Sequence, residues 1–186
     1  MTLLGTLLKN RKADEAHSAW HRPTLRAPEN LTLTSRDFTD GAPMPARQAA
    51  RNTGGEDVSP HLTWTAPPAG TAQLLLVMED LDVPLPRPIT HCVALIDPSR
   101  TELEPGALDA RQPVPGVRPL RASIGRGYHG PGPIKGHGPH RYVFQLYALS
   151  APLGDAAGGA RPGALLSSIA APLLGRGRLT GTYERR

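Results

Sequence analysis

Three runs of apolar residues, each nine residues long, constrain the fold of this chain most strongly. They are Ala72–Asp80, Ile89–Asp97 and Arg141–Leu149 (AQLLLVMED, ITHCVALID and RYVFQLYAL). Runs this short are typical of strands that are covered on both faces. Weaker strand patterns occur at Leu31–Phe38, His61–Ala66 and in the terminal LTGTYERR. The 20 glycines and 21 prolines fall between the runs, which indicates turns and not disorder. The pattern predicts a mainly β domain, an all-β sandwich.

The N-terminal part has a helical pattern instead. Leu3, Leu4, Leu7 and Leu8 fall on one side of a helix predicted from Thr2 to Trp20, which Pro23 would stop. We therefore expect a helical extension over residues 1–22 and one β domain over residues 23–186. The apolar stripe is short, which favours packing on the domain or on a second subunit over anchoring at a membrane surface. The other helical candidate is Gly163–Leu174, interrupted by Pro172.

Charge and cysteine content narrow the class of protein. The net charge of +5 and the pI of about 9.9 favour an anionic partner. The lysines and arginines are scattered, however, which argues against a nucleic-acid-binding protein. The single cysteine, Cys92, fits a reducing compartment. The first apolar run is too short for a signal peptide, and no run approaches the roughly 20 residues of a membrane span. We expect a cytoplasmic protein without a transmembrane segment.

Candidate functional groups gather where strands meet loops. Asp80 and Asp82 end the first apolar run, and alternation along an extended chain predicts that they point the same way. Acids also commonly fix turns at strand ends, so Asp82 has this structural alternative. In the second run, alternation places His91 with Val93 and Leu95, and it places Cys92 on the other face as a small core residue. A Cys–His nucleophile is therefore disfavoured.

The stretch YHGPGPIKGHGPHRY, from Tyr128, is the most unusual in the chain. Its prolines stiffen the backbone and its glycines allow close approach of a ligand. This predicts a rigid rim whose N–H groups, at Gly132, Lys135 and Gly136, could face an anion. If the following strand is extended, His140 and Tyr142 share one face and Arg141 takes the other.

Two other kinds of site are disfavoured. His137, His140, His91 and Asp80 offer metal-ligating atoms, but their spacing matches no recognised metal motif. A serine hydrolase is disfavoured because no G-x-S-x-G occurs. We expect neither a metal nor a cofactor.

Three motifs, in this order, carry a family likeness. GGEDVSPHLTW, EDLDVP and GYHGPGPIKGHGPHRYVFQLYAL resemble the G-x-N-x-SPPLSW, DPDAP and GPxPPxGxHRY motifs of the phosphatidylethanolamine-binding protein family, also called the Raf kinase inhibitor protein family. The terminal GTYERR resembles the bacterial branch. The likeness covers about Leu31 to Arg186 and leaves out the N-terminal helix.

The resemblance implies a Greek-key β-sandwich with few short helices and a small pocket for phosphate-like or phosphorylated ligands. The residues supply no activated nucleophile or assigned general base, so we expect no catalytic residues. The ligand-binding residues that the resemblance carries over are Asp80, Asp82, His91, Gly132, Pro133, His140 and Tyr142. Some positions depart from the family pattern: Leu81 and Ile134 replace prolines, and Ile89–Thr90–His91–Cys92 lacks the usual aromatic residue. One wall of the pocket is therefore expected to be less aromatic.

These residues suggest a chemistry and three functional alternatives. An Asp beside imidazole favours the protonated ring, so His91 and His140 could donate N–H bonds, and Tyr142 an O–H bond, to phosphate oxygens. Affinity for phosphate would then rise as the pH falls through about 6.5. The leading hypothesis is a non-enzymatic anion-binding protein that modulates a kinase or another protein partner. The alternatives are a hydrolase that uses a pocket histidine as general base and a peripheral lipid-surface protein. A homodimer is plausible from the bacterial relatives.

Overall fold

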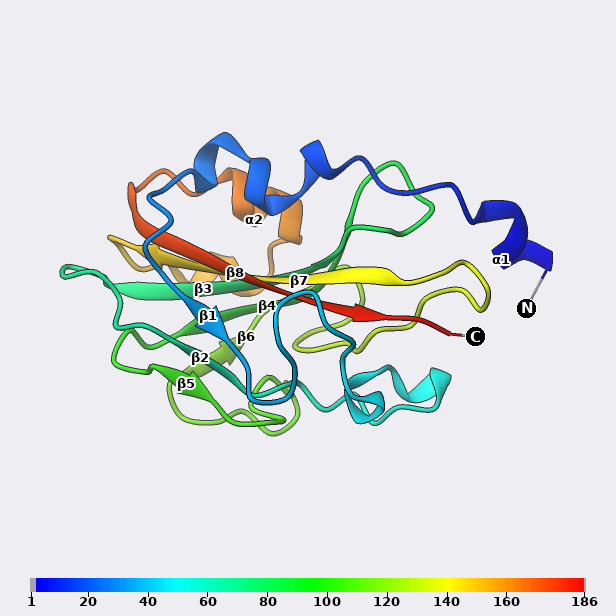
Figure 1. Ribbon diagram of the computed structural model, residues 1–186. Coiled ribbons are helices and arrows are strands. Elements are labelled where there is room, and N and C mark those ends of the chain that lie inside the picture. Colours follow the sequence, from blue (N-terminus) through cyan, green and yellow to red (C-terminus); the bar gives the residue numbers. More distant parts are fainter. Residues whose placement is uncertain (1–2, 186) are drawn as a thin grey trace.

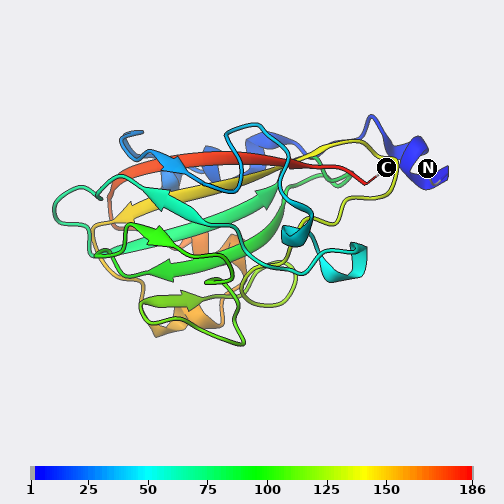
Figure 2. The same ribbon diagram turned by 60° about the horizontal axis from the view of Figure 1, so that its bottom comes forward.

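Two antiparallel sheets form the body of the protein. This computed structural model describes residues 3–185. The five-stranded sheet has the order β6-β4-β3-β7-β8, and the three-stranded sheet has the order β1-β2-β5. The large sheet consists of β3 (Gln73–Asp80), β4 (Ile89–Ile96), β6 (Val117–Pro119), β7 (His140–Leu149) and β8 (Leu173–Tyr183). The small sheet consists of β1 (Leu33–Thr34), β2 (Leu62–Trp64) and β5 (Glu102–Leu103). Figure 2 shows the small sheet lying over one face of the large one.

The connections confirm the predicted sandwich. In the large sheet β3 pairs with β4, and β4 pairs with β6, with β5 of the small sheet between them in the chain. The next strand, β7, returns to lie beside β3. This is the Greek-key arrangement. The short elements β5 and β6 were not predicted. The strand predicted over Leu31–Phe38 shortens to Leu33–Thr34.

The central strands are apolar on both faces because two separate cores cover them. On one face, Leu76 of β3 and Phe144 of β7 join side chains of the small sheet, such as Trp64. On the other face, β3, β4 and β7 pack against residues 3–25, which we call the N-terminal segment, and against the helix α2 (Pro162–Ser167). Figure 1 shows this segment and α2 on the same side of the large sheet. Such two-sided burial is what the unbroken apolar runs predicted.

The predicted helix from Thr2 to Trp20 is wrong in extent. The helix α1 covers only Leu3–Leu8 and is followed by 3-10 turns at Glu15–His17, Ala19–His21 and Pro23–Leu25. Downstream backbone groups bond to the body of the protein instead of to a helical turn. The N–H of Asp14 donates to the carbonyl of Pro86, and that of Ala19 donates to Glu79. The division at residue 22 stays a prediction, although Ala19 and Trp20 belong to the second core.

The apolar stripe of the predicted helix can be followed only in part. The side chains of Leu3 and Leu4 lie outside the described residues. Leu7 is 80% exposed, so most of its side chain is not buried against the described residues. The other 3-10 helices are Ala46–Gln48, Arg51–Thr53 and Asp155–Gly158.

The C-terminal strand and helix also differ from expectation. The helix predicted over Gly163–Leu174 is only α2, and β8 already begins at Leu173. The glycines of β8 interrupt the strand pattern, so the sequence did not show its full length. A Cβ atom on Gly177 would lie 2.0 Å from the carbonyl oxygen of Leu31, and one on Gly181 would lie 2.4 Å from Met44. These glycines therefore let other segments cross β8 closely.

Candidate functional site

A cavity of about 370 Å³ lies where β3 ends and β4 and β7 begin. We call it the strand-end pocket. Five of the seven predicted ligand-binding residues line it: Asp80, His91, Gly132, Pro133 and His140. Tyr142 is fully buried beside them, and its ring lies against the rings of His91 and His140. Asp82 is not part of the lining.

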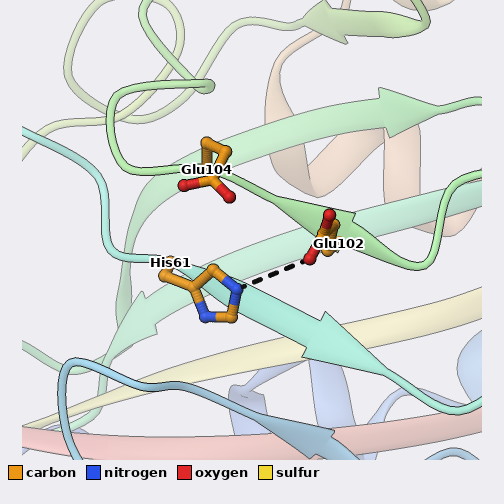
Figure 3. Close-up of side chains that lie close together, drawn as sticks. All are labelled: His61, Glu102 and Glu104. Carbon is orange, nitrogen blue, oxygen red and sulfur yellow. Dashed lines mark ion pairs between the residues drawn. The ribbon is translucent and has the colours of Figure 1, made fainter.

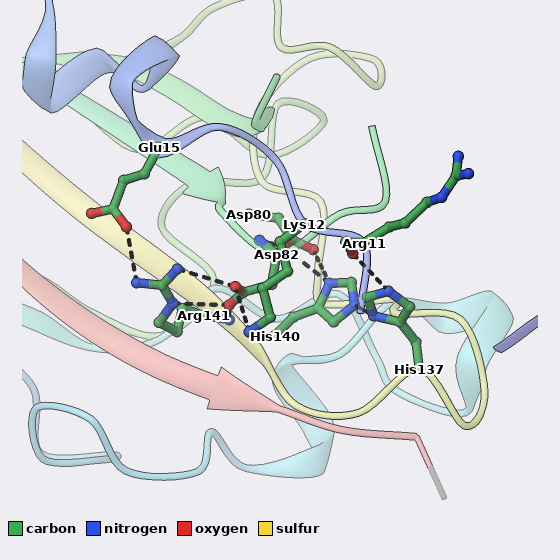
Figure 4. A network of polar contacts seen from close by, with 8 residues as sticks. All are labelled: Arg11, Lys12, Glu15, Asp80, Asp82, His137, His140 and Arg141. Carbon is green, nitrogen blue, oxygen red and sulfur yellow. Dashed lines mark hydrogen bonds and ion pairs between the residues drawn. The ribbon is translucent and has the colours of Figure 1, made fainter. Parts of the chain in front are cut away.

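Two histidine rings connect Asp80 to the N-terminal segment (Figure 4). Nδ1 of His140 lies 2.8 and 3.0 Å from the two carboxylate oxygens of Asp80. Nε2 of His140 lies 2.7 Å from Nδ1 of His137. Nε2 of His137 lies 3.0 Å from the carbonyl oxygen of Arg11. All three side chains are buried, so these contacts take place away from water.

This row of hydrogen bonds determines how many protons it holds. The carbonyl of Arg11 can only accept, so Nε2 of His137 donates to it. The contact between the two rings holds one further proton, carried either by Nδ1 of His137 or by Nε2 of His140. The remaining bond to Asp80 needs one more proton, carried either by Nδ1 of His140 or by the carboxyl. In either form, Asp80 and the two rings together carry no net charge.

The role expected for His140 changes as a result. Sequence reasoning had it donate an N–H directly to a ligand, but both of its ring nitrogens are already engaged within the protein. Direct donation would require His137 to move. In this geometry His140 instead compensates the charge of Asp80. A net-neutral acid at the pocket wall removes the main electrostatic objection to an anionic ligand.

Tyr142 and His91 retain unused hydrogen-bonding capacity at the pocket. The hydroxyl of Tyr142 is buried and has no hydrogen bond of normal geometry, although Asp80 and the backbone of Gly132 lie close enough to act on it. Burial and then the charge of Asp80 raise the pKa of Tyr142, so it stays a donor. His91 uses Nδ1 to bond the carbonyl of His129 at 2.9 Å, which leaves Nε2. Burial lowers the pKa of His91, and its neutral ring presents a lone pair at Nε2.

His91 reaches the pocket because β4 contains a bulge. In the pairing of β3 with β4, Met78 lies opposite Cys92, but the next residue, Glu79, lies opposite Thr90. His91 is therefore one extra residue in β4. A bulge re-aims the side chain that it carries.

The bulge overturns the face predicted for His91. Val93 and Leu95 belong to the core under the N-terminal segment. The ring of His91 lies instead on the opposite face, edge-on to Tyr142 with 5.3 Å between ring centres. Cys92 does face the sandwich core as predicted, and burial raises the pKa of its thiol to about 12, so it is not an activated nucleophile.

Asp82 points away from the pocket, so the prediction that it shares the direction of Asp80 is wrong. The N–H of Asp82 donates to the Asp80 carboxylate at 2.9 Å, and this turn ends the alternation. The Asp82 carboxylate accepts hydrogen bonds from the backbone and guanidinium of Arg141 at 2.8 to 3.1 Å. It also lies 3.0 Å from Nζ of Lys12. Arg141 also forms an ion pair with Glu15 at 3.0 Å. These ion pairs clamp the N-terminal segment to β7 (Figure 4).

The charge state of Asp82 follows from this clamp. Burial alone would raise the pKa of Asp82, but the hydrogen bonds from Arg141 outweigh it and lower the pKa to about 2. Arg141 lies on the face opposite His140 and Tyr142, as alternation predicted.

The Gly- and Pro-rich loop before β7 forms one wall of the pocket. Gly130 has no room for a side chain, because a Cβ atom would lie 2.3 Å from the carbonyl oxygen of Gln48. Gly138 has a φ of 110°, which favours glycine. The N–H of Gly136 donates to the carbonyl of Arg185 at 2.9 Å, so the prediction that it faces an anion is wrong.

The mouth of the pocket is apolar, which sequence reasoning had only partly anticipated. Among residues 3–185, the large apolar side chains that are exposed are Leu7, Leu85 and Ile124, and the last two line this mouth. Ile89 and Ile134, noted as departures from the family pattern, line it as well. Leu85 directly follows the EDLDVP motif and Ile124 lies in the loop after β6, and neither had a local signal that marked it as part of the site.

A possible metal cluster elsewhere does not fit a metal ion. His61, Glu102 and Glu104 lie together on the small-sheet side (Figure 3). Nδ1 of His61 accepts the N–H of Arg36 at 3.3 Å, so the neutral ring carries its proton on Nε2, toward Glu102. A metal would need that nitrogen deprotonated. Glu104 is also paired with Arg36. The contacts describe an ion-pair network.

Comparisons with known proteins agree with this fold. A family model described as phosphatidylethanolamine-binding protein matches residues 34–184. An Aquifex aeolicus UPF0098 protein is 34% identical over 98% of this chain and 99% of its own length. A Mycobacterium tuberculosis protein named as a candidate lipoprotein, LppC, is 35% identical over 85% of this chain and 74% of its own length. The crystal structure of Escherichia coli YbcL, titled a new member of the mammalian PEBP family, superposes with a TM-score of 0.72 at 26% identity, over 84% of this chain and 99% of that one. Within the described residues, no helix is long and apolar enough to cross a membrane.

Proposed function

We propose, from the premise that the chain belongs to the phosphatidylethanolamine-binding protein family, that it is a non-enzymatic binding protein whose strand-end pocket takes a small phosphate-like or phosphorylated ligand. The observation that carries the proposal is the buried Tyr142 hydroxyl, which lies beside Asp80 and Gly132 and has no hydrogen bond of normal geometry within residues 3–185. A buried donor without a partner costs free energy that a ligand oxygen would recover.

The pocket would bind its ligand together with a proton. Nε2 of neutral His91 is an acceptor, so it repels a fully ionised phosphate and pairs with one that carries a hydrogen. A phosphate monoester gains that hydrogen near pH 6. If His91 were protonated instead of the phosphate, the complex would hold the same total number of protons. Affinity is therefore expected to rise as the pH falls from 8 to 6.

The apolar mouth supports a ligand with more than a phosphate group. Leu85 and Ile124 are half-exposed and line the same pocket as the polar side chains of Asp80, His91 and His140. A ligand that covered Leu85 and Ile124 would remove apolar surface from water. O-Phosphorylethanolamine carries an aminoethyl group that inorganic phosphate lacks and that would reach this mouth. Tighter binding of the second would assign a role to the mouth.

A calorimetric titration with both compounds at pH 6 and pH 8 tests the proposal. Tyr142→Phe removes only the hydroxyl and is expected to weaken binding by about 1 kcal/mol, roughly five-fold. His91→Gln is expected to flatten the pH dependence. Tyr147→Phe is the matched control, since Tyr147 lies on β7 but faces the other core. Equal affinities at both pH values, or equal losses in both tyrosine variants, would exclude this binding mode.

The hydrolase alternative has one specific observation in its favour, the free Nε2 of His91. His140 is less suited to be a general base, because His137 occupies its Nε2. Turnover of a phosphoester that His91→Gln abolishes would replace binding with catalysis as the function.

The remaining expectations stay predictions. They are modulation of a kinase or other protein partner, a homodimer, attachment to a lipid surface through α1, and a cytoplasmic location. The relative named as a candidate lipoprotein makes the location worth testing by fractionation.

A further inference from the structure

A second and larger hollow lies on the other face of the large sheet. Its volume is about 510 Å³, against about 370 Å³ for the strand-end pocket. The N-terminal segment, the loop after β6 and the start of α2 form its walls, and Glu79 of β3 lies at its floor. None of the predicted ligand-binding residues lines it. The site argued below is therefore independent of the function proposed above.

Four arginines converge on this hollow, which we call the arginine cleft. They are Arg22, Arg87, Arg121 and Arg161. Within residues 3–185, none of the four has a carboxylate within ion-pair distance. Arginines elsewhere on the surface do pair with acids, as Arg36 does with Glu104. Unpaired like charges that line one hollow repel one another unless an anion lies between them.

The one acid of the cleft does not offset these charges. Glu79 is 4% exposed, and its Oε2 accepts hydrogen bonds from the N–H of Ala19 at 2.8 Å and from Nε2 of Gln145 at 2.9 Å. Its carboxylate is thus committed to holding the N-terminal segment on the sheet. At most one negative charge faces four positive ones.

Arg22 is held in place at the wall of the cleft. Its guanidinium is fixed by hydrogen bonds from Nη1 to the hydroxyl of Ser167 at 3.0 Å and to the carbonyl of Gly163 at 3.5 Å. Its Nε is buried and has no hydrogen-bond partner among the described residues. Arg87, Arg121 and Arg161 are exposed at the edge, where their side chains can move onto a ligand.

We propose that the arginine cleft binds a small anion that carries at least two negative charges, of the diphosphate type. Guanidinium groups bond phosphate oxygens in pairs, and several of them around one ligand favour a compact group of high charge over a single carboxylate. The volume suits a small molecule.

Calorimetry with pyrophosphate tests the proposal, with the full chain at physiological ionic strength. The variant Arg121→Gln/Arg161→Gln removes two charges from the cleft edge without touching Arg22 or Glu79. We expect its affinity for pyrophosphate to fall at least ten-fold. The control Arg36→Gln/Arg111→Gln removes two charges from exposed ion pairs outside the cleft and is expected to bind as the unaltered protein does.

Three results would overturn the proposal. They are no binding of pyrophosphate by the unaltered protein, an equal loss in the control variant, and a loss caused by Tyr142→Phe but not by the cleft variant. The last result would place the anion in the strand-end pocket. Because the two edge arginines are exposed and make no side-chain hydrogen bonds within the described residues, circular dichroism is expected to show both double variants folded.

Discussion

The strand-end pocket and the arginine cleft lie on opposite faces of the large sheet, at the end of the same strand, β3. They differ in how the charge of the acid in each is balanced. Glu79 and Asp80 are consecutive in β3 and face the cleft and the pocket respectively. Asp80 is compensated by a histidine that other buried groups hold in place. Glu79 is bound by uncharged amide groups and makes no ion pair within the described residues, although the charge of Arg22 acts on it. The strand supplies similar acids on both sides, and the loops and the N-terminal segment decide what each side can bind.

The largest expected effect is a difference in stability between a variant of Asp80 and a variant of Glu79. Asp80→Asn disrupts the buried contact of Asp80 with His140 and is expected to cost about 3 kcal/mol of unfolding free energy. Glu79→Gln is expected to cost about 1 kcal/mol or less, because a glutamine oxygen can still accept from Ala19. Urea denaturation of both variants measures the difference. Similar losses would mean that the contact of Asp80 with His140 stabilises the fold no more than the hydrogen bonds of Glu79 do.

The clamp at Asp82 comes next in size. Asp82→Asn weakens the hydrogen bonds to Arg141 and Lys12 and is expected to cost about 2 kcal/mol above pH 4. The pKa of Asp82 is lowered to about 2, so its stabilisation is present above its unfolded value of 3.8 and disappears as the pH falls toward 2. The variant should therefore lose less stability than the unaltered protein over this interval. Parallel acid-unfolding curves for the two proteins would show that the clamp does not set this pKa.

The two faces are also expected to respond to pH in opposite directions. Burial raises the pKa of Glu79, so its folded form holds a proton that the unfolded chain has released, and stability falls as the pH rises above about 4.5. Burial lowers the pKa of His91, so its unfolded form binds a proton first, and stability falls as the pH decreases below about 6.5. Each slope is at most about 1.4 kcal/mol per pH unit. Melting curves of Glu79→Gln and His91→Gln should each lose one slope and keep the other.

The smallest effect concerns the cleft without its ligand. Arg121→Gln/Arg161→Gln relieves repulsion and is expected to stabilise the free protein by a few tenths of a kcal/mol at low salt. The gain should vanish at 1 M salt, where screening is strong. Thermal melts at two salt concentrations measure it. A destabilised variant would mean that these arginines support the fold.

Sequence reasoning succeeded where a local pattern matches a physical cause. Central strands such as Gln73–Asp80 were predictable because both faces are buried. The face of His91 was not, because a bulge leaves no mark in the sequence. The direction of Asp82 depended on Arg141, which lies 59 residues away. The cleft was invisible because its arginines are spread from Arg22 to Arg161 and meet only in the folded chain.

The long reach of the N-terminal segment has a consequence for biosynthesis. The partners of Ala19, Arg11 and Glu15 follow them in the chain by 60, 126 and 126 residues. At a ribosomal rate of about 5–20 residues per second, the segment waits on the order of 10 s before β7 is made. The segment therefore cannot complete these contacts before β7 is synthesised, and contacts between residues so far apart in the chain form slowly. A nascent chain stalled before His137 would leave both hollows unfinished and the apolar face of β3 open to chaperones.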